Sequence, residues 1–447
     1  MKVAILGFAR EGRSVLKFLK RDGVFKNAEI SVLDNNRNIK VPAGIKRETG
    51  AGYLKNLRKF DIVFRTPGIP YLLPEIQKAE KSGVKISSAT KLFFERCSGT
   101  IVGITGTKGK GTTSTLLYKI LKAASKKACL AGNIGKPALD ILPKADKKSI
   151  VVFELSSFQL QDIEKSPSVA AVLDIFPDHL NTHKNLKEYY NSKANIAHYQ
   201  KRGDKTFFFK NNPLSKKIAS KGIGRKIGID KKSFRIFSPD DLLVKGAHNL
   251  KNAAMAATIA KYLGVPDKII FKTVSKFRGT EHRLELVRKI KLPIHSWHSH
   301  TVSRNSHYIY FYNDSASTNP QTAAAAIKSF PNEEKILIVG GQDKNLDYRP
   351  LAEALKNSGT KLVILLGENR NKIKKAIEKI KNDELRIMLV NTLFQAVKSA
   401  YKFAKKMSVT HSSSFIVLFS PAATSFDSFE NYSDRGRKFK KIVKQLE

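Results

Sequence analysis

The chain has 447 residues, 41% of them hydrophobic and 27% charged, which is enough for two to four domains with buried cores. It has no run of 18 apolar residues and only two cysteines, which argues against a membrane-spanning helix, a disulfide framework and a four-cysteine zinc site. The net charge of +43 is spread over the chain and carried mainly by lysine, and no zinc-finger, RRM or KH motif is present. We therefore expect a solvated basic surface and no specific nucleic-acid partner.

The N-terminal residues MKVAILG form an apolar run too short for a signal peptide, and no small-residue cleavage site follows it. They are typical of a first β-strand. We expect a cytoplasmic, monomeric protein.

The first predicted unit covers residues 1–97. A strand at 3–6 leads into the glycine turn 7–12 and then a helix, and a second strand at 30–33 ends at Asp34. This pattern is similar to a dinucleotide-binding unit, in which glycines permit the tight turn and the acid accepts a hydrogen bond from a ribose. The match is degenerate, because Ala9 stands in place of the middle glycine.

A third strand of this unit is predicted at 61–64. It leads into the turn Thr66-Pro67-Gly68. Ligands bind at the carboxyl ends of strands in such sheets, so this turn is a candidate binding segment.

The second unit, residues 98–286, opens with GITGTKGKGTTST at 103–115, between an apolar strand and an apolar helical pattern. Glycines let backbone N–H groups surround phosphate oxygens, and the helix directs its positive end at the same anion. Lys110 is placed to reach the β- and γ-phosphates. The pattern predicts an ATP site, with a ligand-free glycine turn as the alternative.

The loop departs from the general phosphate-loop pattern at one position. Gly111 follows Lys110 where a Ser or Thr usually holds Mg²⁺. The next hydroxyl belongs to Thr112, to which we assign the metal contact.

Two further strands of this unit end in metal-binding residue types. The strand 150–153 leads into Glu154, and the strand 169–175 leads into Asp178 and His179. Beside a phosphate loop, these groups suit Mg²⁺ and nucleotide binding. Taken singly, Glu154 is as consistent with a helix cap, and His179 with a packed or solvent-exposed histidine.

The third unit covers residues 287–447. Strands are predicted at 309–312, 336–339, 362–366 and 415–419, with helices between them. Strands and helices alternate almost throughout the chain, which favours α/β domains with parallel sheets. Residues 291–308 hold four of the ten histidines without a cysteine or carboxylate, so we interpret them as an exposed inserted loop rather than a metal site.

In this order, the motifs resemble those of the Mur ligases, the ATP-dependent amide-forming enzymes of peptidoglycan precursor synthesis. The resemblance covers essentially the whole chain. The segments that carry it are Gly103–Thr112, Gly132–Gly135, Glu154–Leu160, Asp178–Leu180, Lys193, Ala247–Asn249 with Asn252, Glu281–Arg283, Asn313–Ser315, Gly340–Lys344 and Ser420–Tyr432.

The resemblance implies a three-domain α/β ligase: a Rossmann-like domain at 1–97 for the UDP end of one substrate, a P-loop domain with a mostly parallel sheet at 98–286 for ATP, and a Rossmann-like domain at 287–447 for an amino acid. It is closest to the members that join D-glutamate to UDP-N-acetylmuramoyl-L-alanine through an acyl phosphate. It also implies ATP and two Mg²⁺ ions as cofactors.

The resemblance assigns roles residue by residue. The catalytic residues are Lys110, Glu154, His179 and Lys193, of which Lys193 resembles the carbamylated lysine of the family. The metal ligands are Thr112, Glu154, His179 and Lys193. The ATP-binding residues are Gly106, Thr107, Lys108, Gly109, Lys110, Gly111, Thr112, Asn252, Arg283 and Asp314. The residues for the UDP-linked substrate are Gly7, Arg10, Glu11, Gly12, Asp34, Thr66, Pro67, Gly68, Asn133 and Ser156. The amino-acid-binding residues are Thr318, Lys344, Ser425, Phe426 and Tyr432.

Two departures from the family pattern leave alternatives open. Ala316 replaces a family lysine, which leaves open a ligase for another amino acid. Gly111 is similar to the loop of the folylpolyglutamate synthases, although those enzymes lack a leading domain of the kind seen here. A basic ATP-binding or nucleic-acid-binding protein without ligase activity is the alternative from another class.

Overall fold

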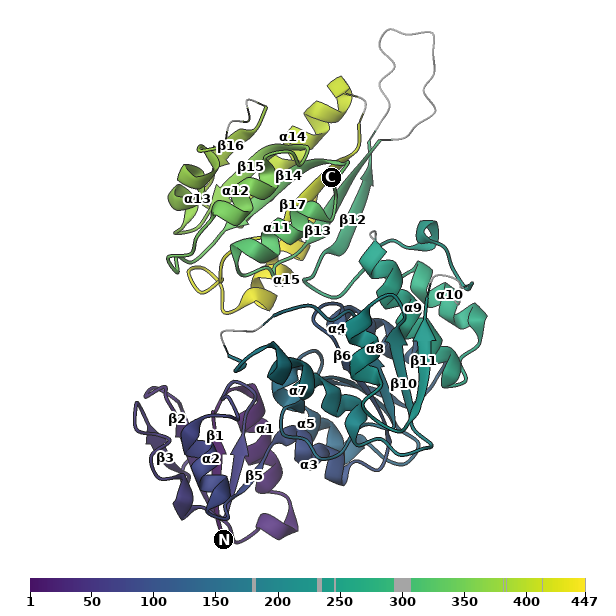
Figure 1. The fold of residues 1–447 in the computed structure, drawn as a ribbon. Helices are drawn as coiled ribbons and strands as arrows, with labels where there is room; N and C mark the ends of the chain where they lie inside the picture. Colours follow the sequence, from purple (N-terminus) through teal and green to yellow (C-terminus); the bar gives the residue numbers. More distant parts are fainter. Residues whose placement is uncertain are drawn as a thin grey trace. The chain divides into compact units, whose positions relative to one another are not determined.

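The computed structural model describes residues 1–178, 182–230, 235–244, 247–292, 307–380, 382, 384–411 and 413–446. These residues form two compact units, one comprising Met1–Ser238 and His248–Val274, the other Pro239–Ala247 and Ser275–Glu447. The first unit holds two β-sheets and the second holds one (Figure 1). His179 and most of the histidine-rich stretch, residues 293–306, lie outside the described residues.

The N-terminal sheet is parallel, with the strand order β3-β2-β1-β4-β5. Its strands are β1 (Lys2–Leu6), β2 (Glu29–Asp34), β3 (Lys46–Thr49), β4 (Ile62–Arg65) and β5 (Lys85–Ser87), and its helices are α1 (Arg10–Leu19), α2 (Pro74–Lys81) and α3 (Ala89–Arg96), with short 3₁₀ turns at Gly23–Phe25 and Leu57–Lys59. The strand order reverses at β1 and β4, so the turns that follow these two strands flank a switch point, where α/β sheets bind ligands.

The central sheet is also parallel, in the order β11-β10-β9-β6-β8-β7. Its strands are β6 (Thr100–Thr105), β7 (Ala128–Gly132), β8 (Ile150–Glu154), β9 (Val169–Val172), β10 (Lys205–Phe209) and β11 (Arg225–Ile229). The helices are α4 (Lys110–Ala123), α5 (Ala138–Ile141), α6 (Ser157–Leu160), α7 (Leu186–His198), α8 (Pro213–Ala219), α9 (Ala247–Tyr262) and α10 (Asp267–Ser275), with 3₁₀ turns at Leu142–Lys144 and Pro239–Asp241.

The C-terminal sheet is mixed, in the order β12-β13-β17-β14-β15-β16. Its strands are β12 (Glu285–Lys291), β13 (Tyr308–Asn313), β14 (Glu334–Gly340), β15 (Thr360–Leu366), β16 (Arg386–Leu389) and β17 (Phe415–Phe419), and its helices are α11 (Pro320–Lys328), α12 (Arg349–Leu355), α13 (Arg370–Ile377), α14 (Leu393–His411) and α15 (Tyr432–Lys444). Only β12 runs antiparallel among the described strands, at one edge beside β13. The α/β fold class predicted from the sequence is confirmed.

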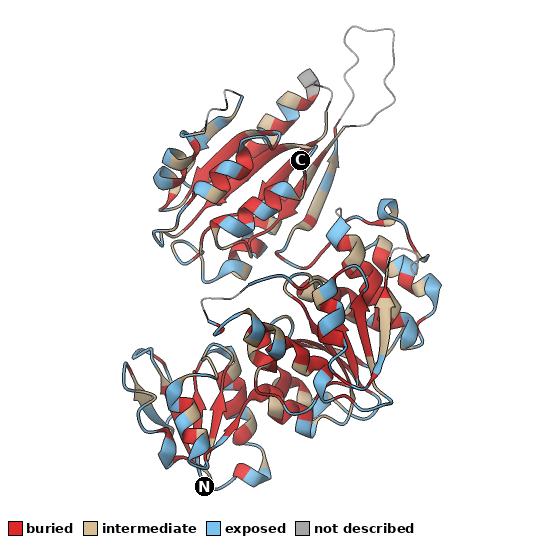
Figure 2. Cartoon of the chain, in the orientation of Figure 1, coloured by how far each residue is buried: buried red, intermediate tan, exposed pale blue. Residues whose placement is uncertain are grey.

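The inner strands of the sheets are nearly continuous apolar runs. This pattern is expected where helices cover both faces of a parallel sheet. Figure 2 shows these strands as buried, with exposed residues on the outer sides of the helices. No helix in the described part of the chain is long and apolar enough to cross a membrane.

The N-terminal and central sheets share one hydrophobic core. Helix α3 supplies Phe93 and Phe94, whose rings lie 5.4 and 5.9 Å from the ring of Phe153 in β8. Phe93 and Phe153 are fully buried. Burial of large aromatic rings is a strong contribution to packing, so these rings help to hold the two sheets of the first unit together.

Candidate functional site

The phosphate loop connects β6 to α4, as the sequence predicts. Gly109 directly precedes the helix with φ of +85°, a conformation that favours glycine. A Cβ atom at this position would lie 2.2 Å from Oδ1 of Asn252. Glycine therefore permits Asn252, which comes from α9 and is buried, to approach the loop closely.

Two lysines converge on one carbonyl oxygen of this loop. Nζ of Lys110 donates to the Gly106 carbonyl at 2.8 Å and to the Thr107 carbonyl at 3.1 Å, and Nζ of Lys193 donates to the Gly106 carbonyl at 3.0 Å. Lys193 comes from α7 and is 2% exposed. Burial, and then the charge of Lys110, lower the pKa of Lys193 well below its ordinary value, whereas Asp178 acts in the opposite direction. This shift favours the neutral form of the Lys193 amine.

Tyr189 anchors the same loop to α7. Its hydroxyl lies 2.8 Å from Oγ1 of Thr107, and its ring lies 4.9 Å from Nζ of Lys193. Burial raises the pKa of Tyr189 to about 12, so the hydroxyl stays protonated. The tyrosine thus fixes the position of α7, and with it Lys193, against the loop.

Glu154 ends β8 beside the start of α4. A Cβ atom at Gly111 would lie 3.7 Å from Oε2 of Glu154 and 2.3 Å from Cδ1 of Ile134. The Ile134 side chain therefore lies where a side chain at position 111 would enter and would have to move to admit one. Thr112, one residue further along α4, is half-buried.

The donors near the loop fit Mg²⁺, because that ion prefers oxygen ligands and needs few from the protein. Glu154 supplies a buried carboxylate and Thr112 a hydroxyl. His179, the third predicted ligand, lies outside the described residues. Within the described ranges, no group of three His, Cys, Asp or Glu side chains is placed to hold a metal.

Predicted residues for the UDP-linked substrate meet at the carboxyl ends of β1, β2 and β4. The Asp34 carboxylate accepts from the backbone N–H of Phe8 at 2.7 Å, which braces the glycine turn. Oγ1 of Thr66 donates to the Leu6 carbonyl at 2.9 Å, against Gly7. Pro67 is half-buried and Gly68 is exposed in the turn that follows β4.

A second group of these residues lies where the N-terminal sheet meets the central one. Arg10 donates to the Asn133 carbonyl at 3.3 Å and to the Gly135 carbonyl, and the Glu11 carboxylate accepts from Nε2 of Gln159 at 2.9 Å. Burial raises the pKa of Glu11, and the bond from Gln159 opposes this. The structure thus brings Arg10 together with Asn133, and Glu11 with the helix that Ser156 begins.

Ser156 and Gly12 have structural uses at this junction. The Ser156 hydroxyl accepts from the backbone N–H of Gln159 and caps α6. A Cβ atom at Gly12 would lie 2.1 Å from the Gly7 carbonyl oxygen, so glycine lets α1 pack closely on its own turn.

Asp314 lies at the end of β13 in the second unit. Its carboxylate accepts from Oγ of Ser420 at 2.8 Å and from the backbone N–H of Leu284 at 3.2 Å. Burial raises the pKa of Asp314 to about 7, and these hydrogen bonds and the charge of Arg283 oppose the rise. Arg283 itself is exposed.

The backbone on both sides of Arg283 is strained. His282 and Leu284 have φ of +63° and +43°, a region that residues other than glycine seldom adopt. His282 is buried, with Nδ1 2.9 Å from Nδ2 of Asn313. Tertiary contacts therefore hold the backbone that presents Arg283.

The predicted amino-acid-binding residues come from loops at the carboxyl ends of β13, β14 and β17 and from the start of α15. Nζ of Lys344 lies 5.8 Å from the ring of Phe426, and Tyr432 packs edge-on to His282 with ring centres 6.3 Å apart. Phe426 and Tyr432 are largely exposed, Thr318 is half-buried, and Ser425 is buried. The structure places all five residues at the end of the sheet where the parallel strands have their carboxyl ends.

Sequence reasoning missed the buried arginine that holds two of these loops together. Arg435, in α15, donates to the carbonyls of Ser315 at 3.0 Å, Ala423 at 2.9 Å and Thr424 at 3.2 Å. Burial lowers the pKa of Arg435 to about 10. Nothing in the sequence distinguishes this residue, because it stands in a basic helix among other cations.

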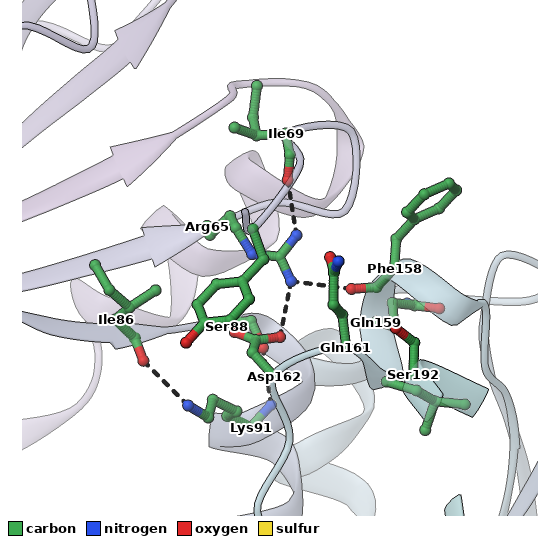
Figure 3. A network of polar contacts seen from close by, with 12 residues as sticks. Arg65, Ile69, Ile86, Ser88, Lys91, Phe158, Gln159, Gln161, Asp162 and Ser192 are labelled. Carbon is green, nitrogen blue, oxygen red and sulfur yellow. Dashed lines mark hydrogen bonds and ion pairs between the residues drawn. The ribbon is translucent and has the colours of Figure 1, made fainter. Parts of the chain in front are cut away.

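Arg65 was also missed. It is buried at the end of β4 and forms an ion pair with Asp162, with Nη2 2.7 Å from Oδ1 (Figure 3). Sequence reasoning could not single out Arg65, because one arginine at the end of an apolar strand matches no known motif.

The phosphate loop and the oxygen donors beside it define a nucleotide-binding P-loop protein, and family models identify its class. Residues 104–241 match the Mur ligase middle domain, and residues 1–88 match the MurD-like N-terminal domain of Mur ligases. The chain belongs to the Mur ligase family.

A curated relative supports this family, and two solved structures share the fold. The chain is 35% identical to the UDP-N-acetylmuramoylalanine–D-glutamate ligase of Acetivibrio thermocellus, over 100% of this chain and 97% of that protein. The fold resembles the UDP-N-acetylmuramate–alanine ligase MurC of Thermotoga maritima, with a TM-score of 0.54, 18% identity and 99% of each chain covered. It also resembles the MurF ligase of Thermotoga maritima in complex with ADP, with a TM-score of 0.52, 16% identity and 99% and 95% of the two chains covered.

Proposed function

We propose that this chain joins the amine of D-glutamate to the carboxyl group of UDP-N-acetylmuramoyl-L-alanine, with cleavage of ATP to ADP and phosphate. Residues 1–97 would bind the UDP end, residues 98–286 the ATP, and residues 287–447 the amino acid. The third sheet begins slightly before that last boundary, because β12 starts at Glu285. The substrates would meet the enzyme in the cytoplasm, and we propose that it acts as a monomer.

The observation that carries this proposal is the convergence of Lys110 and Lys193 on the Gly106 carbonyl. The Lys110 ammonium at the mouth of a glycine loop that leads into a helix suits the phosphates of a nucleotide, and Lys193 lies beside it at the position of the family's carbamylated lysine. The match over the full length to a D-glutamate ligase supports the choice of substrates.

The chemistry needs an activated carboxyl group, because a carboxylate does not react with an amine at a useful rate. Attack of the carboxylate oxygen on the γ-phosphorus breaks the bond to ADP and forms an acyl phosphate. The amine of D-glutamate then attacks the acyl carbon and loses a proton, and phosphate leaves. Most of the acceleration would come from positioning and charge stabilisation.

The residues of the phosphate loop have direct tasks in the first step. Lys110 would leave its loop carbonyls and bind the β- and γ-phosphates. Asn252, held against Gly109, would bind the nucleoside together with Asp314, and Arg283 would stabilise the transferred phosphoryl group. Gly106–Thr112 would surround the phosphates with backbone N–H groups.

Thr112, Glu154, His179 and a carbamylated Lys193 would hold two Mg²⁺ ions. Bound there, the ions would neutralise the phosphates and so reduce their repulsion of the substrate carboxylate. The oxygen donors at Thr112 and Glu154 fit this ion.

The environment of Lys193 favours a carbamate. Carbamylation requires a neutral amine, which attacks CO₂ and releases one proton, and the lowered pKa of Lys193 favours that form of the amine. The product is an anion, so it would attract the neighbouring Lys110 ammonium, whose charge disfavours the protonated amine at Lys193.

The remaining roles follow the predicted assignment. Gly7, Asp34 and the turn Thr66–Gly68 would bind the uridine diphosphate, and Arg10, Glu11, Asn133 and Ser156 the sugar and its peptide end. Lys344 and Thr318 would bind one carboxylate of glutamate, and Ser425 with the backbone near Phe426 and Tyr432 would bind the other.

The test is an ADP-release assay with UDP-N-acetylmuramoyl-L-alanine against a panel of D- and L-amino acids. We expect release with D-glutamate and a low rate without an amino acid. Release only with a different amino acid would contradict the substrate assignment. A lack of release with every amino acid, together with tight, salt-dependent nucleic-acid binding, would favour the non-enzymatic alternative.

A further inference from the structure

The guanidinium of Arg65 joins three separate segments. Nη1 donates to the Ile69 carbonyl at 2.7 Å, whereas Nη2 donates to the Phe158 carbonyl at 2.9 Å and to Oδ1 of Asp162 at 2.7 Å (Figure 3). Ile69 follows β4, Phe158 is in α6, and Asp162 comes after α6. One planar group therefore connects the N-terminal sheet to the central domain.

The ion pair at this junction is buried on both sides. The side chains of Arg65 and Asp162 are each 1% exposed. Nε of Arg65 and Oδ2 of Asp162 make no hydrogen bond among the described residues, so the pair lacks the two-pronged geometry that gives the strongest attraction. A buried ion pair is seldom more stabilising than apolar residues of the same shape. The geometry of the Arg65–Asp162 ion pair is therefore better explained by the segments that Arg65 positions.

On one side, the guanidinium fixes the turn that follows β4. The bond from Arg65 to the Ile69 carbonyl closes over Thr66, Pro67 and Gly68, and the Ile69 N–H donates to the Thr66 carbonyl at 3.0 Å. The Tyr71 ring lies 5.7 Å from the guanidinium carbon. These contacts hold the backbone of the turn in place.

On the other side, the guanidinium fixes α6. This short helix begins at the cap Ser156 and holds Gln159, which donates to Glu11 at 2.9 Å. Arg65 contacts the helix backbone itself, at the Phe158 carbonyl. Displacement of the guanidinium would thus move both the turn and the helix.

We propose that Arg65 is a positioning residue for the UDP-linked substrate. It sets the spacing between Thr66–Gly68 and the start of α6, the two segments proposed to bind that substrate, and so this role rests on the proposed function. A lysine could not replace it, because a single ammonium group lacks the planar fork that reaches three oxygens in fixed directions.

The matched control is another ion pair between the same two parts of the first unit. Nζ of Lys91, in α3, lies 3.0 Å from the exposed Glu164 and donates to the Ile86 carbonyl at 3.2 Å. Within the described part of the chain, the Lys91 side chain forms no hydrogen bond or ion pair with the turn or with α6. Lys91→Met therefore removes a cross-link of similar reach without touching either segment.

The experiment compares R65M, R65K, K91M and the double variant R65M/D162L with the wild type. Scanning calorimetry gives the unfolding midpoint, titration calorimetry gives the Kd of UDP-N-acetylmuramoyl-L-alanine, and ADP release gives kcat and each KM. R65M alone leaves the Asp162 charge buried and is expected to lose stability. The double variant replaces both charges with apolar groups and is expected to unfold near the wild-type midpoint.

A positioning role predicts that the double variant binds the UDP-linked substrate roughly tenfold or more weakly despite its restored stability, because small displacements of positioning groups are costly. The KM for ATP should change by less than about twofold, and K91M should behave as the wild type. R65K should resemble R65M in Kd.

A double variant that regains both stability and wild-type affinity would show that Arg65 serves folding only, and would overturn the proposal. An equal loss in K91M would overturn it as well. A wild-type chain that neither binds nor uses the substrate would refute the proposed function and this role together, whereas an active wild type with unaffected variants would refute this role alone.

Discussion

Lys110 and Lys193 donate to one loop carbonyl, and the charge of Lys110 contributes to the lowered pKa of Lys193. Lys110 is half-buried, whereas Lys193 is almost fully buried. Burial penalises the charged form of an amine. Burial therefore favours the neutral form of Lys193, which is the form that reacts with CO₂.

Lys110→Ala tests the phosphate contact. Removing a charge that stabilises the transition state commonly costs about 10²–10³ in kcat, and we expect ADP release to fall at least that far. Lys122→Ala, an exposed lysine on the same helix, is the control and should keep wild-type activity. Normal turnover in the Lys110 variant would exclude the assigned role.

Lys193→Met tests the ionisation of the buried amine. In the unfolded chain, Lys193 keeps a proton up to its ordinary pKa of 10.5, whereas the lowered pKa of the folded chain releases that proton at lower pH. The unfolded state thus binds more protons, and the contribution of unmodified Lys193 to stability increases as pH rises toward 10.5. Without CO₂, the variant should have the higher thermal midpoint at pH 7, and the difference should shrink by pH 10.

Activity gives the complementary measurement for Lys193. The methionine variant should lose activity at every pH, and mass spectrometry of the wild type in bicarbonate should show the added mass of one CO₂ on this lysine. Recovery of Lys193→Ala by a short carboxylate would support the carbamate. Full activity of either variant without added carboxylate would rule it out.

Asp314→Asn tests the opposite kind of ionisation. The pKa of this carboxyl is raised from 3.8 to about 7, so the folded state holds the extra proton between these values. The contribution of Asp314 to stability is therefore largest below about pH 4 and falls as pH rises to about 7. Asparagine does not ionise, so the variant avoids this loss of stability. The thermal midpoint of the variant relative to that of the wild type should therefore be higher at pH 8 than at pH 5.

The helix α4 and its preceding loop form the element on which the nucleotide assignment depends. Gly109→Ala would force a side chain into a backbone with φ of +85° and against Asn252. Such strain costs about 1–3 kcal/mol, and we expect weakened binding of a non-hydrolysable ATP analogue by titration calorimetry. Gly203→Ala, where a Cβ meets nothing within 4 Å, is the control. Equal binding by both variants would contradict this account of the loop.

Local sequence patterns were sufficient to predict the elements whose structure and role depend mainly on their own residues. Glycines, a lysine and an apolar strand predicted the phosphate loop, and buried apolar runs predicted the strands in the middle of each sheet. The predicted strand 169–175 was too long, because its ladder with β6 ends where β6 turns into the phosphate loop, and β9 accordingly stops at Val172.

Elements that depend on distant partners could not be predicted in the same way. The edge strand β12 pairs antiparallel with β13 across the histidine-rich stretch, and its alternating residues are only partly buried. Arg65, His282 and Arg435 acquire their importance from contacts with residues far along the chain. No spacing in the sequence reveals such pairs.

On the scale of the whole molecule, the N-terminal and central sheets share one hydrophobic core, in which Phe93 and Phe94 of α3 pack against Phe153 of β8. Phe93→Ala should cost about 3–5 kcal/mol, typical of a large buried aromatic ring, and should increase amide hydrogen exchange in both sheets. Phe60 packs in a separate cluster of the N-terminal sheet, so Phe60→Ala should increase exchange in that sheet alone. Confinement of the Phe93 effect to one sheet would argue against a shared core.

The shared core also limits how this enzyme can be recombined with its relatives. A chimera joined near residue 97 would separate Phe93 and Phe94 from Phe153, and Arg65 from Asp162. Each of the two joined portions would then expose residues whose packing partners are missing from the other portion. Exchange of the uridine-recognising portion between family members should therefore yield a folded hybrid only when the facing residues of the central portion are transplanted with it.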